Sequence, residues 1–184
     1  MKRIVVGVSG ASGIPYAQRL LEELARITAV ETHLVISAGA REVMRREGYE
    51  PDQLERLAAF SYNPADLGAV LASGSFRTSG MVIVPASATT AGKLAAGIAD
   101  NLLLRAAYVH IKEKRPLILL LRETPLPLPS LQALVTLAQA GVIVMPASPG
   151  FYNQPNKIKD LLDFMVQRIL DHLSLNASGP RWEG

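Results

Sequence analysis

The chain has 184 residues, of which 49% are hydrophobic, and a formal net charge of +3 at pH 7 with no cysteine. A chain of this length and hydrophobicity can bury one substantial core, so we expect residues 1–184 to form a single domain, while the interleaving of basic with acidic residues argues against nucleic acid as a partner. The lack of cysteine excludes disulfides and thiolate chemistry, and the lack of a membrane-spanning apolar run or a signal-peptide pattern predicts a cytoplasmic protein.

The first predicted element is a buried strand over residues 4–8, which runs into a turn of small residues. Gly10 and Gly13 allow the backbone to turn sharply and to approach a ligand closely. Ser12 is predicted to cap the helix that follows, with Pro15 tolerated in its first turn, so that free N–H groups of this helix would face a phosphate or a polar ring. The pattern favours a nucleotide or flavin site over a turn that serves packing alone.

The rest of the chain alternates apolar runs with helical patterns, and the pattern is weak only over residues 61–80. Hydrophobic spacing and turn residues predict strands over 33–36, 81–84, 117–121 and 142–145, and helices over 14–29, 39–47 and 52–60, from near Gly92, and over 100–113, 131–140 and 156–175. Near-continuous apolar strands that alternate with helices predict an α/β fold: a doubly wound parallel sheet with helices on both faces, of the Rossmann or flavodoxin-like type.

Unusual residues follow each predicted strand. Ligands of such sheets bind beyond the carboxyl ends of the strands, so these residues should converge on one crevice. They are Gly10 and Ser12 after the first strand, Ser37 after the second, Ser87 and Thr90 after the third, Arg122 and Glu123 after the fourth, and Tyr152 after the fifth.

Four cationic side chains are candidates for binding a phosphate. Arg105 and Lys112 lie seven residues apart on one face of a predicted helix, although a solvated face explains Lys112 equally well. Arg168 stands among apolar residues of the last helix, where a buried or half-buried arginine needs an anionic partner. Arg122 ends a buried strand, and either a phosphate or a structural pair with Glu123 would account for it.

Two other residues are candidates with competing explanations. Tyr152 lies in a loop between Gly150 and Pro155, where an aromatic ring is either a lid over a ligand or a plug for the core. Glu47 ends a predicted helix, where a carboxylate is usually only solvated. The histidines lie in different elements without metal-ligand spacing, so we expect no metal.

A dehydrogenase is a less favoured interpretation. Tyr108 and Lys112 have the spacing of the short-chain dehydrogenases, and the glycines of the first loop are similar to a dinucleotide fingerprint. Such an enzyme needs an acidic residue at the end of the second strand to bind the ribose, whereas Ser37 stands there. A hydroxyl at this place suits a phosphate.

Seven short motifs, read together, carry a resemblance to a known family. In chain order they are Gly-Ala-Ser-Gly, Thr-His-Leu-Val-Ile-Ser, Ser-Gly-Ser-Phe, Pro-Ala-Ser-x-x-Thr, Lys-Glu-Lys-Arg-Pro-Leu, Arg-Glu-Thr-Pro-Leu and Gly-Phe-Tyr-Asn-Gln-Pro. With these motifs the chain resembles the flavin prenyltransferases, which join a dimethylallyl group, taken from dimethylallyl monophosphate, to reduced FMN. Their product, prenylated FMN, is the cofactor of a separate decarboxylase of the ubiquinone pathway type.

The resemblance implies roles for individual residues. It places FMN against Gly10, Ala11, Ser12, Ser37, Ser87, Ala88, Thr89, Thr90 and Arg122, with Ser37 and Arg122 near the phosphate, and it assigns dimethylallyl phosphate to Arg105, Lys112, Tyr152 and Arg168. Glu47 and Glu123 correspond to family carboxylates implicated in proton handling. The family forms a dodecamer with sites between subunits, which implies a homo-oligomer whose neighbouring chains supply some of these groups.

Two other functions stay open at this point. One is a flavin-dependent decarboxylase of peptidyl-cysteine or phosphopantothenoylcysteine, because residues 85–90 resemble its Pro-Ala-Ser-Ala-Asn-Thr turn, although Thr89 replaces the asparagine. The other is a flavin carrier without chemistry of its own, which would not explain the cationic side chains. Since the chain has no aspartate-rich metal motif, we expect prenyl transfer without Mg²⁺, with cations balancing the leaving phosphate and the ring of Tyr152 facing the developing allyl cation.

Overall fold

The computed structural model describes residues 1–175, and residues 176–184 lie outside the described part. Strands and helices alternate along the chain. In order they are β1 (Lys2–Val8), α1 (Ile14–Ala25), β2 (Val30–Ile36), α2 (Ala38–Glu47), α3 (Pro51–Glu55), β3 (Phe60–Tyr62), the 3₁₀ turn η1 (Val70–Ala72), β4 (Gly80–Ala86), α4 (Ala88–Ala95), α5 (Leu102–Lys112), β5 (Leu117–Leu121), α6 (Leu128–Gln139), β6 (Ile143–Pro146) and α7 (Ile158–His172).

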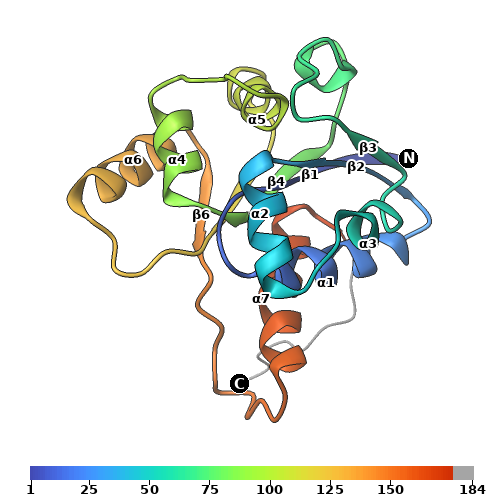
Figure 1. Cartoon of the computed structure of the whole chain (residues 1–184), viewed down its shortest axis with the longest axis vertical. Coiled ribbons are helices and arrows are strands. Elements are labelled where there is room, and N and C mark those ends of the chain that lie inside the picture. The colour runs from blue at the N-terminus through green and yellow to red at the C-terminus, as the bar shows by residue number, and fades with distance from the viewer. Residues whose placement is uncertain (176–184) are drawn as a thin grey trace.

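The sheet has six parallel strands in the order β3-β2-β1-β4-β5-β6 (Figure 1). β1 and β4 lie side by side at its centre, with Ile4 opposite Gly80 and Gly7 opposite Ile83. The chain winds outward from β1 to β3, crosses back, and winds outward again from β4 to β6. The direction of winding therefore changes between β1 and β4, and such a switch point opens a crevice beyond the carboxyl ends of the two strands. The predicted doubly wound parallel sheet is confirmed.

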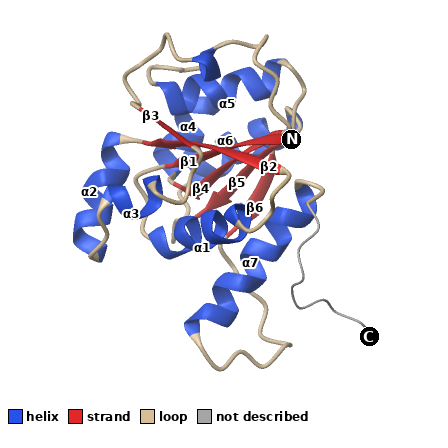
Figure 2. Cartoon of the chain, turned by 90° about the vertical axis from the view of Figure 1, so that its right-hand side faces the viewer, coloured by secondary structure: helices blue, strands red, loops and turns tan. Residues whose placement is uncertain are grey.

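Helices cover both faces of the sheet (Figure 2). α1, α2, α3 and α7 contribute to one apolar core, and α4, α5 and α6 contribute to the other. Alternate residues of β1 enter the two cores, Val6 on the side of α1 and Val5 on the side of α5. Burial on both faces explains why these strands are continuous apolar runs in the sequence. Within residues 1–175, none of the helices combines the length and the apolar character needed to span a bilayer.

The structure adds an edge strand that the sequence pattern does not predict. The helix predicted over 52–60 ends at Glu55, and Phe60–Tyr62 pairs with β2 as β3. The Phe60 ring stacks on the ring of His33 with 5.1 Å between centroids, and the Tyr62 hydroxyl lies 2.9 Å from His33 Nδ1. A strand of three residues is too short to show an alternating pattern, and its partners are distant in the sequence.

Several helix ends also differ from the predicted ones. α1 stops at Ala25 instead of continuing to residue 29, and α7 spans Ile158–His172 instead of 156–175. α4 begins before Gly92 because Ser87 caps it, and α6 begins before residue 131 because Pro129 fits its first turn.

His110 is a buried titratable residue in the last turn of α5. Its ring is 2% exposed, with Nδ1 2.8 Å from the carbonyl oxygen of Ala106 and Nε2 2.8 Å from the hydroxyl of Thr78. Burial lowers the pKa of His110 from its ordinary value of 6.5 to about 4. The folded protein therefore holds a neutral imidazole between a carbonyl acceptor and a hydroxyl donor.

This burial predicts a pH-dependent stability. Between pH 6.5 and about pH 4 the unfolded chain takes up a proton on His110 that the folded chain does not, so the free energy of unfolding falls as the pH falls through this window, by about 3 kcal/mol in all. Urea unfolding at several pH values, for the wild type and for His110→Gln, measures the contribution. The glutamine variant should lose less stability on acidification, and equal pH slopes for the two proteins would contradict the account.

Candidate functional site

The carboxyl ends of β1 and β4 are joined by Ser9, the first residue after β1. The Ser9 hydroxyl donates to the carbonyl oxygen of Pro85 at 2.9 Å and accepts from the amide of Ser87 at 2.8 Å, and its own amide donates to the same Pro85 oxygen at 3.2 Å. Ser9 is 1% exposed. Ser9 is not among the site residues predicted from the sequence, although a hydroxyl directly after a buried strand is a signal that points to it.

The turn after β1 lies directly against the start of α2. A Cβ atom on Gly10 would stand 3.2 Å from the backbone carbonyl carbon of Gly39, which is tighter than most Cβ contacts in proteins. Gly10 therefore allows the two backbones to meet. Residues 9–13 and the beginning of α2 therefore lie side by side at the switch point, where the sequence predicts the crevice.

The start of α1 differs from the prediction. Its N-cap residue is Gly13, no side chain of the cap contributes a hydrogen bond, and Ser12 is exposed. The carboxylate of Glu47, at the end of α2, accepts instead from the amides of Gly13 and Ile14, each at 3.0 Å. Ser12 is therefore not the cap, and these α1 amides face a carboxylate of the protein rather than a ligand. Glu47 is held in place rather than merely solvated.

Two other helices begin at the same edge with their caps in place. The Ser37 hydroxyl accepts from the amide of Ala40 at 3.1 Å at the start of α2. The Ser87 hydroxyl accepts from the amide of Thr90 at 3.1 Å at the start of α4 and donates to the Thr90 hydroxyl at 3.0 Å. The first amides of a helix have no acceptor within the helix, and the positive end of the helix dipole attracts anions. α2 and α4, rather than α1, offer the ends that suit a phosphate.

Arg122 supplies a donor that the protein itself does not satisfy. Its amide donates to the carbonyl oxygen of Ala86 at 3.0 Å, which places it beside Ser87. Within residues 1–175, the Nε atom of Arg122 is buried and has no hydrogen-bond partner. No ion pair joins Arg122 to the exposed Glu123 in this part of the chain, so the structural pair considered for these two residues is not formed. A buried donor left without an acceptor is costly, and a phosphate oxygen would satisfy it.

Arg105 and Lys112 lie on one side of α5, as their spacing predicts, and face the end of η1 and the residues that follow it. Arg105 Nε donates to the carbonyl oxygen of Ala72 at 3.2 Å. The Lys112 ammonium pairs with Glu113 and lies 2.7 Å from the place that a Cβ on Gly74 would take. The last turn of α5 leads into β5, so Lys112 lies toward the amino end of the strands. Within one chain it does not join Arg122 at the carboxyl edge.

Tyr152 belongs to a projecting part of the chain, whereas Arg168 lies near the end of α7, next to buried residues of that helix. The loop after β6 and the beginning of α7 extend away from the sheet in both views (Figures 1 and 2). Tyr152 is 53% exposed and meets the ring of Phe164 edge-on, with 5.7 Å between centroids. The Arg168 side chain is 51% exposed, and its Nη1 donates to Asp171 at 3.3 Å. The expectation of a buried or half-buried Arg168 is wrong, because its position lies just outside the buried stripe of α7.

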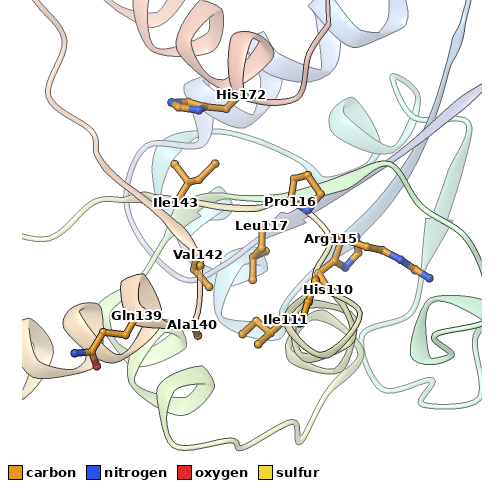
Figure 3. A pocket seen from close by; sticks show the side chains of 12 residues that line it. His110, Ile111, Arg115, Pro116, Leu117, Gln139, Ala140, Val142, Ile143 and His172 are labelled. Carbon is orange, nitrogen blue, oxygen red and sulfur yellow. The ribbon is translucent and has the colours of Figure 1, made fainter.

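A cavity of about 530 Å³ lies at the opposite, amino edge of the sheet (Figure 3). It is bordered by the ends of α5, α6 and α7, where His110, Gln139 and His172 stand, and by the first residues of β5 and β6. None of the predicted site residues lines it, so it is separate from the crevice at the switch point. Residues 1–175 contain no group of three or more His, Asp or Glu side chains placed to hold a metal ion.

A doubly wound sheet with glycine and hydroxyl turns at its switch point, and an arginine there whose buried Nε has no partner within residues 1–175, defines a protein of the nucleotide- or flavin-binding class. The model of the family described as Flavoprotein matches residues 1–170, and the chain belongs to that family. The chain is 53% identical over 182 residues to the flavin prenyltransferase UbiX of Deinococcus radiodurans, covering 98% of this chain and 93% of the relative. Within the flavoproteins, the chain is a member of the flavin prenyltransferase family.

Solved structures of two relatives superpose on nearly the whole chain. A structure described as AnUbiX (PadA1) in complex with FMN and dimethylallyl pyrophosphate has a TM-score of 0.96 and 39% identity, and the match covers 100% of this chain and 98% of the other. A structure described as a dodecameric FMN-dependent UbiX-like decarboxylase from Escherichia coli O157:H7 has a TM-score of 0.95 and 42% identity, with 99% of each chain covered.

The Glu47 cap predicts a stability effect that is separate from any chemistry. Glu47→Ala removes the acceptor for two amides of α1 and should lower the free energy of unfolding by about 1 kcal/mol, and Glu47→Gln, which keeps one acceptor oxygen, should lower it less. Urea unfolding measures both. Glu42→Ala is the matched control, because within residues 1–175 the ion pairs of Glu42 are with Arg45 and Arg46, whose side chains are exposed. Equal losses for Glu47→Ala and Glu42→Ala would contradict a capping role.

Proposed function

We propose that this chain transfers a dimethylallyl group from dimethylallyl monophosphate to reduced FMN and releases prenylated FMN to a separate decarboxylase of the ubiquinone pathway type. The observation that carries the proposal is the buried Nε of Arg122, which has no hydrogen-bond partner within residues 1–175. It lies at the same edge of the sheet as the capped starts of α2 and α4, in a member of the flavin prenyltransferase family. We further propose that residues 1–184 act as one flavin-binding domain in the cytoplasm.

The residues at the carboxyl edge fit FMN. Ser37 and Arg122 would hold the phosphate, because the start of α2 offers helix amides and Arg122 offers a buried donor that needs an anion. The turn formed by Gly10, Ala11 and Ser12 and the turn formed by Ser87, Ala88, Thr89 and Thr90 would border the isoalloxazine ring. Reduced FMN, when bound, supplies the nucleophilic nitrogen that accepts the allyl group, so the protein needs no nucleophile of its own.

The residues proposed for the allyl phosphate do not meet within one chain. Lys112 and Arg105 lie on α5, on one face of the sheet, whereas Arg168 and Tyr152 lie on or before α7, which packs on the other face. One phosphate cannot contact both groups of the same chain across the sheet. We therefore propose that copies of this chain assemble, as a dodecamer like the E. coli O157:H7 relative, and that Lys112 and Arg168 of different copies meet at one site.

The chain's own side chains can balance the charges of the reaction. Arg105, Lys112 and Arg168 would stabilise the phosphate as it leaves, and the ring face of Tyr152 would stabilise the developing allyl cation. Glu47 and Glu123, one held against α1 and the other exposed beside Arg122, are the proposed groups for proton transfer. We propose that this set replaces the metal that other prenyl transfers use.

The two alternatives that the sequence leaves open are less well supported. The relatives that cover nearly the whole chain at 53% and 48% identity are named flavin prenyltransferases, not cysteine decarboxylases. A flavin carrier would not explain a set of arginine and lysine side chains on two separate elements. Both alternatives predict that no prenylated flavin forms.

The reaction is tested by anaerobic incubation with reduced FMN and dimethylallyl monophosphate, followed by mass analysis of the flavin. We expect prenylated FMN to form equally in EDTA and in added Mg²⁺, because cationic side chains rather than a metal balance the phosphate. Dimethylallyl pyrophosphate, the compound found with AnUbiX, is run in parallel as the competing donor. An absolute need for Mg²⁺ would refute the metal-free mechanism, and CO₂ release from a cysteinyl peptide without flavin prenylation would favour the decarboxylase.

The shared site is tested by mixing two defective variants. Lys112→Ala and Arg168→Ala should each weaken use of the allyl phosphate about tenfold to a hundredfold while sparing FMN binding, since each removes a charge-assisted phosphate contact. Co-expression of the two variants should restore about a quarter of the wild-type activity. Random assembly of a symmetric oligomer leaves Lys112 intact at about half of the sites and, independently, Arg168 intact at about half, so both are intact at about a quarter.

Lys112→Ala mixed with Arg105→Ala is the matched control for this experiment. Both residues lie on the same side of α5 in one chain, so this mixture should stay as defective as its parents. If the mixture of Lys112→Ala and Arg168→Ala also shows no recovery, the two residues do not come from different copies.

A further inference from the structure

Within residues 1–175, Ser9 is the one residue whose side chain forms hydrogen bonds with both Pro85 and Ser87. These two residues flank Ala86, the last residue of β4. We propose that Ser9 is a positioning residue for flavin binding: its hydroxyl holds the end of β4, and through Ser87 the start of α4, in the geometry that receives the flavin. This inference rests on the proposed function of the crevice. It assigns no contact between Ser9 and the flavin itself.

Beyond Ile83 the end of β4 is no longer paired with β1, whereas on its other side Ala86 lies opposite Leu121 and accepts a hydrogen bond from the Arg122 amide. The ladder between β1 and β4 stops at Gly7 opposite Ile83, and the register between β4 and β5 is irregular from Ile83 to Ala86. Pro85 lies in this stretch and has no amide hydrogen to give to a ladder. Ser9 gives two hydrogen bonds to the Pro85 carbonyl oxygen, one from its amide and one from its hydroxyl.

The bond from Ser87 to Ser9 sets the beginning of α4. Because the Ser87 amide donates to the Ser9 hydroxyl, Ser87 is held with its own hydroxyl toward the amide of Thr90 and its carbonyl toward the amide of Ala91. These two contacts form the first turn of α4. A change at Ser9 would therefore move the turn at 87–90 while leaving in place every side chain that is proposed to contact the flavin.

Ser9 also relates α4 to α2. It is followed by Gly10, whose backbone meets the backbone of Gly39 in the first turn of α2. Two neighbouring residues after β1 thus locate the beginnings of both helices that are proposed to face the flavin. The hydroxyl of Ser9 determines the α4 side of this arrangement, and Gly10 determines the α2 side.

The test compares Ser9→Ala with Ser9→Thr and with Thr32→Val. Ser9→Ala leaves the Ser87 amide without its acceptor, so we expect the Kd for FMN, measured by flavin fluorescence, to rise about tenfold. Ser9→Thr keeps the hydroxyl and should restore most of the affinity. Thr32→Val is the matched control: it removes a hydroxyl that is also buried, 4% exposed, but lies in β2 opposite Ile4, away from the crevice, and it should leave the Kd unchanged.

A second measurement separates positioning from stability. At saturating FMN, Ser9→Ala should keep the wild-type KM for the allyl phosphate, and the visible absorption bands of its bound flavin should shift. If Ser9→Ala does not fold, Ser9→Cys replaces it, because the thiol has a similar size and is a much weaker hydrogen-bonding group.

The outcomes distinguish this inference from the proposed function. A folded Ser9→Ala protein with a lower melting temperature but an unchanged Kd for FMN would overturn the positioning role, as would an equal rise in Kd for Thr32→Val. If the wild type binds FMN but forms no prenylated flavin, the proposed reaction fails while the role of Ser9 is still measurable. If the wild type binds no FMN, both fail.

Discussion

The site depends on the parallel pairing of β1 with β4 at the centre of the sheet. This pairing lies where the direction of winding changes, so the turns after the two strands diverge and leave room between them for a ligand. The pairing ends at Gly7 and Ile83, and beyond it the hydrogen bonds of Ser9 to Pro85 and Ser87 are what keep the two turns at a fixed separation. The apolar cores on both faces hold the strands, and a few polar bonds at their ends hold the crevice.

The helices that begin at this edge are used in two different ways. α1 is neutralised by a carboxylate of the protein, since Glu47 accepts from Gly13 and Ile14. α2 and α4 are capped by serines, which satisfy one amide each and leave the positive end of the helix dipole without a charged partner from the cap. Arg122 adds a buried donor beside α4. The electrostatic preference for an anion therefore lies between α2, α4 and Arg122, and not at the start of α1, where the sequence looks most like a phosphate loop.

Much of the fold and part of the site could be predicted from the sequence. The buried strands were predicted because burial on both faces produces continuous apolar runs, and Ser37 and Ser87 were predicted to lie at the site because each follows the end of such a run. The Glu47 cap could not be predicted. Glu47 is separated in the sequence from Gly13 by 34 positions and from Ile14 by 33, and only the fold brings these residues together. β3 was missed because three residues show no periodicity, and the exposure of Arg168 was misjudged because it lies at the edge of the buried stripe of α7.

The predicted site residues lie in three places: the carboxyl edge of the sheet, α5, and α7 with the loop before it. Residues from these three places can form one site only if copies of the chain assemble.

The central claim is that the flavin lies at the switch point with its phosphate on Arg122, and a crystal structure of this protein grown with FMN tests it most directly. The account predicts a phosphate oxygen within hydrogen-bond distance of Arg122 Nε and Ser9 still bonded to Ser87. Flavin bound elsewhere, for example in the cavity at the amino edge of the sheet, with Arg122 Nε still lacking an acceptor, would contradict it.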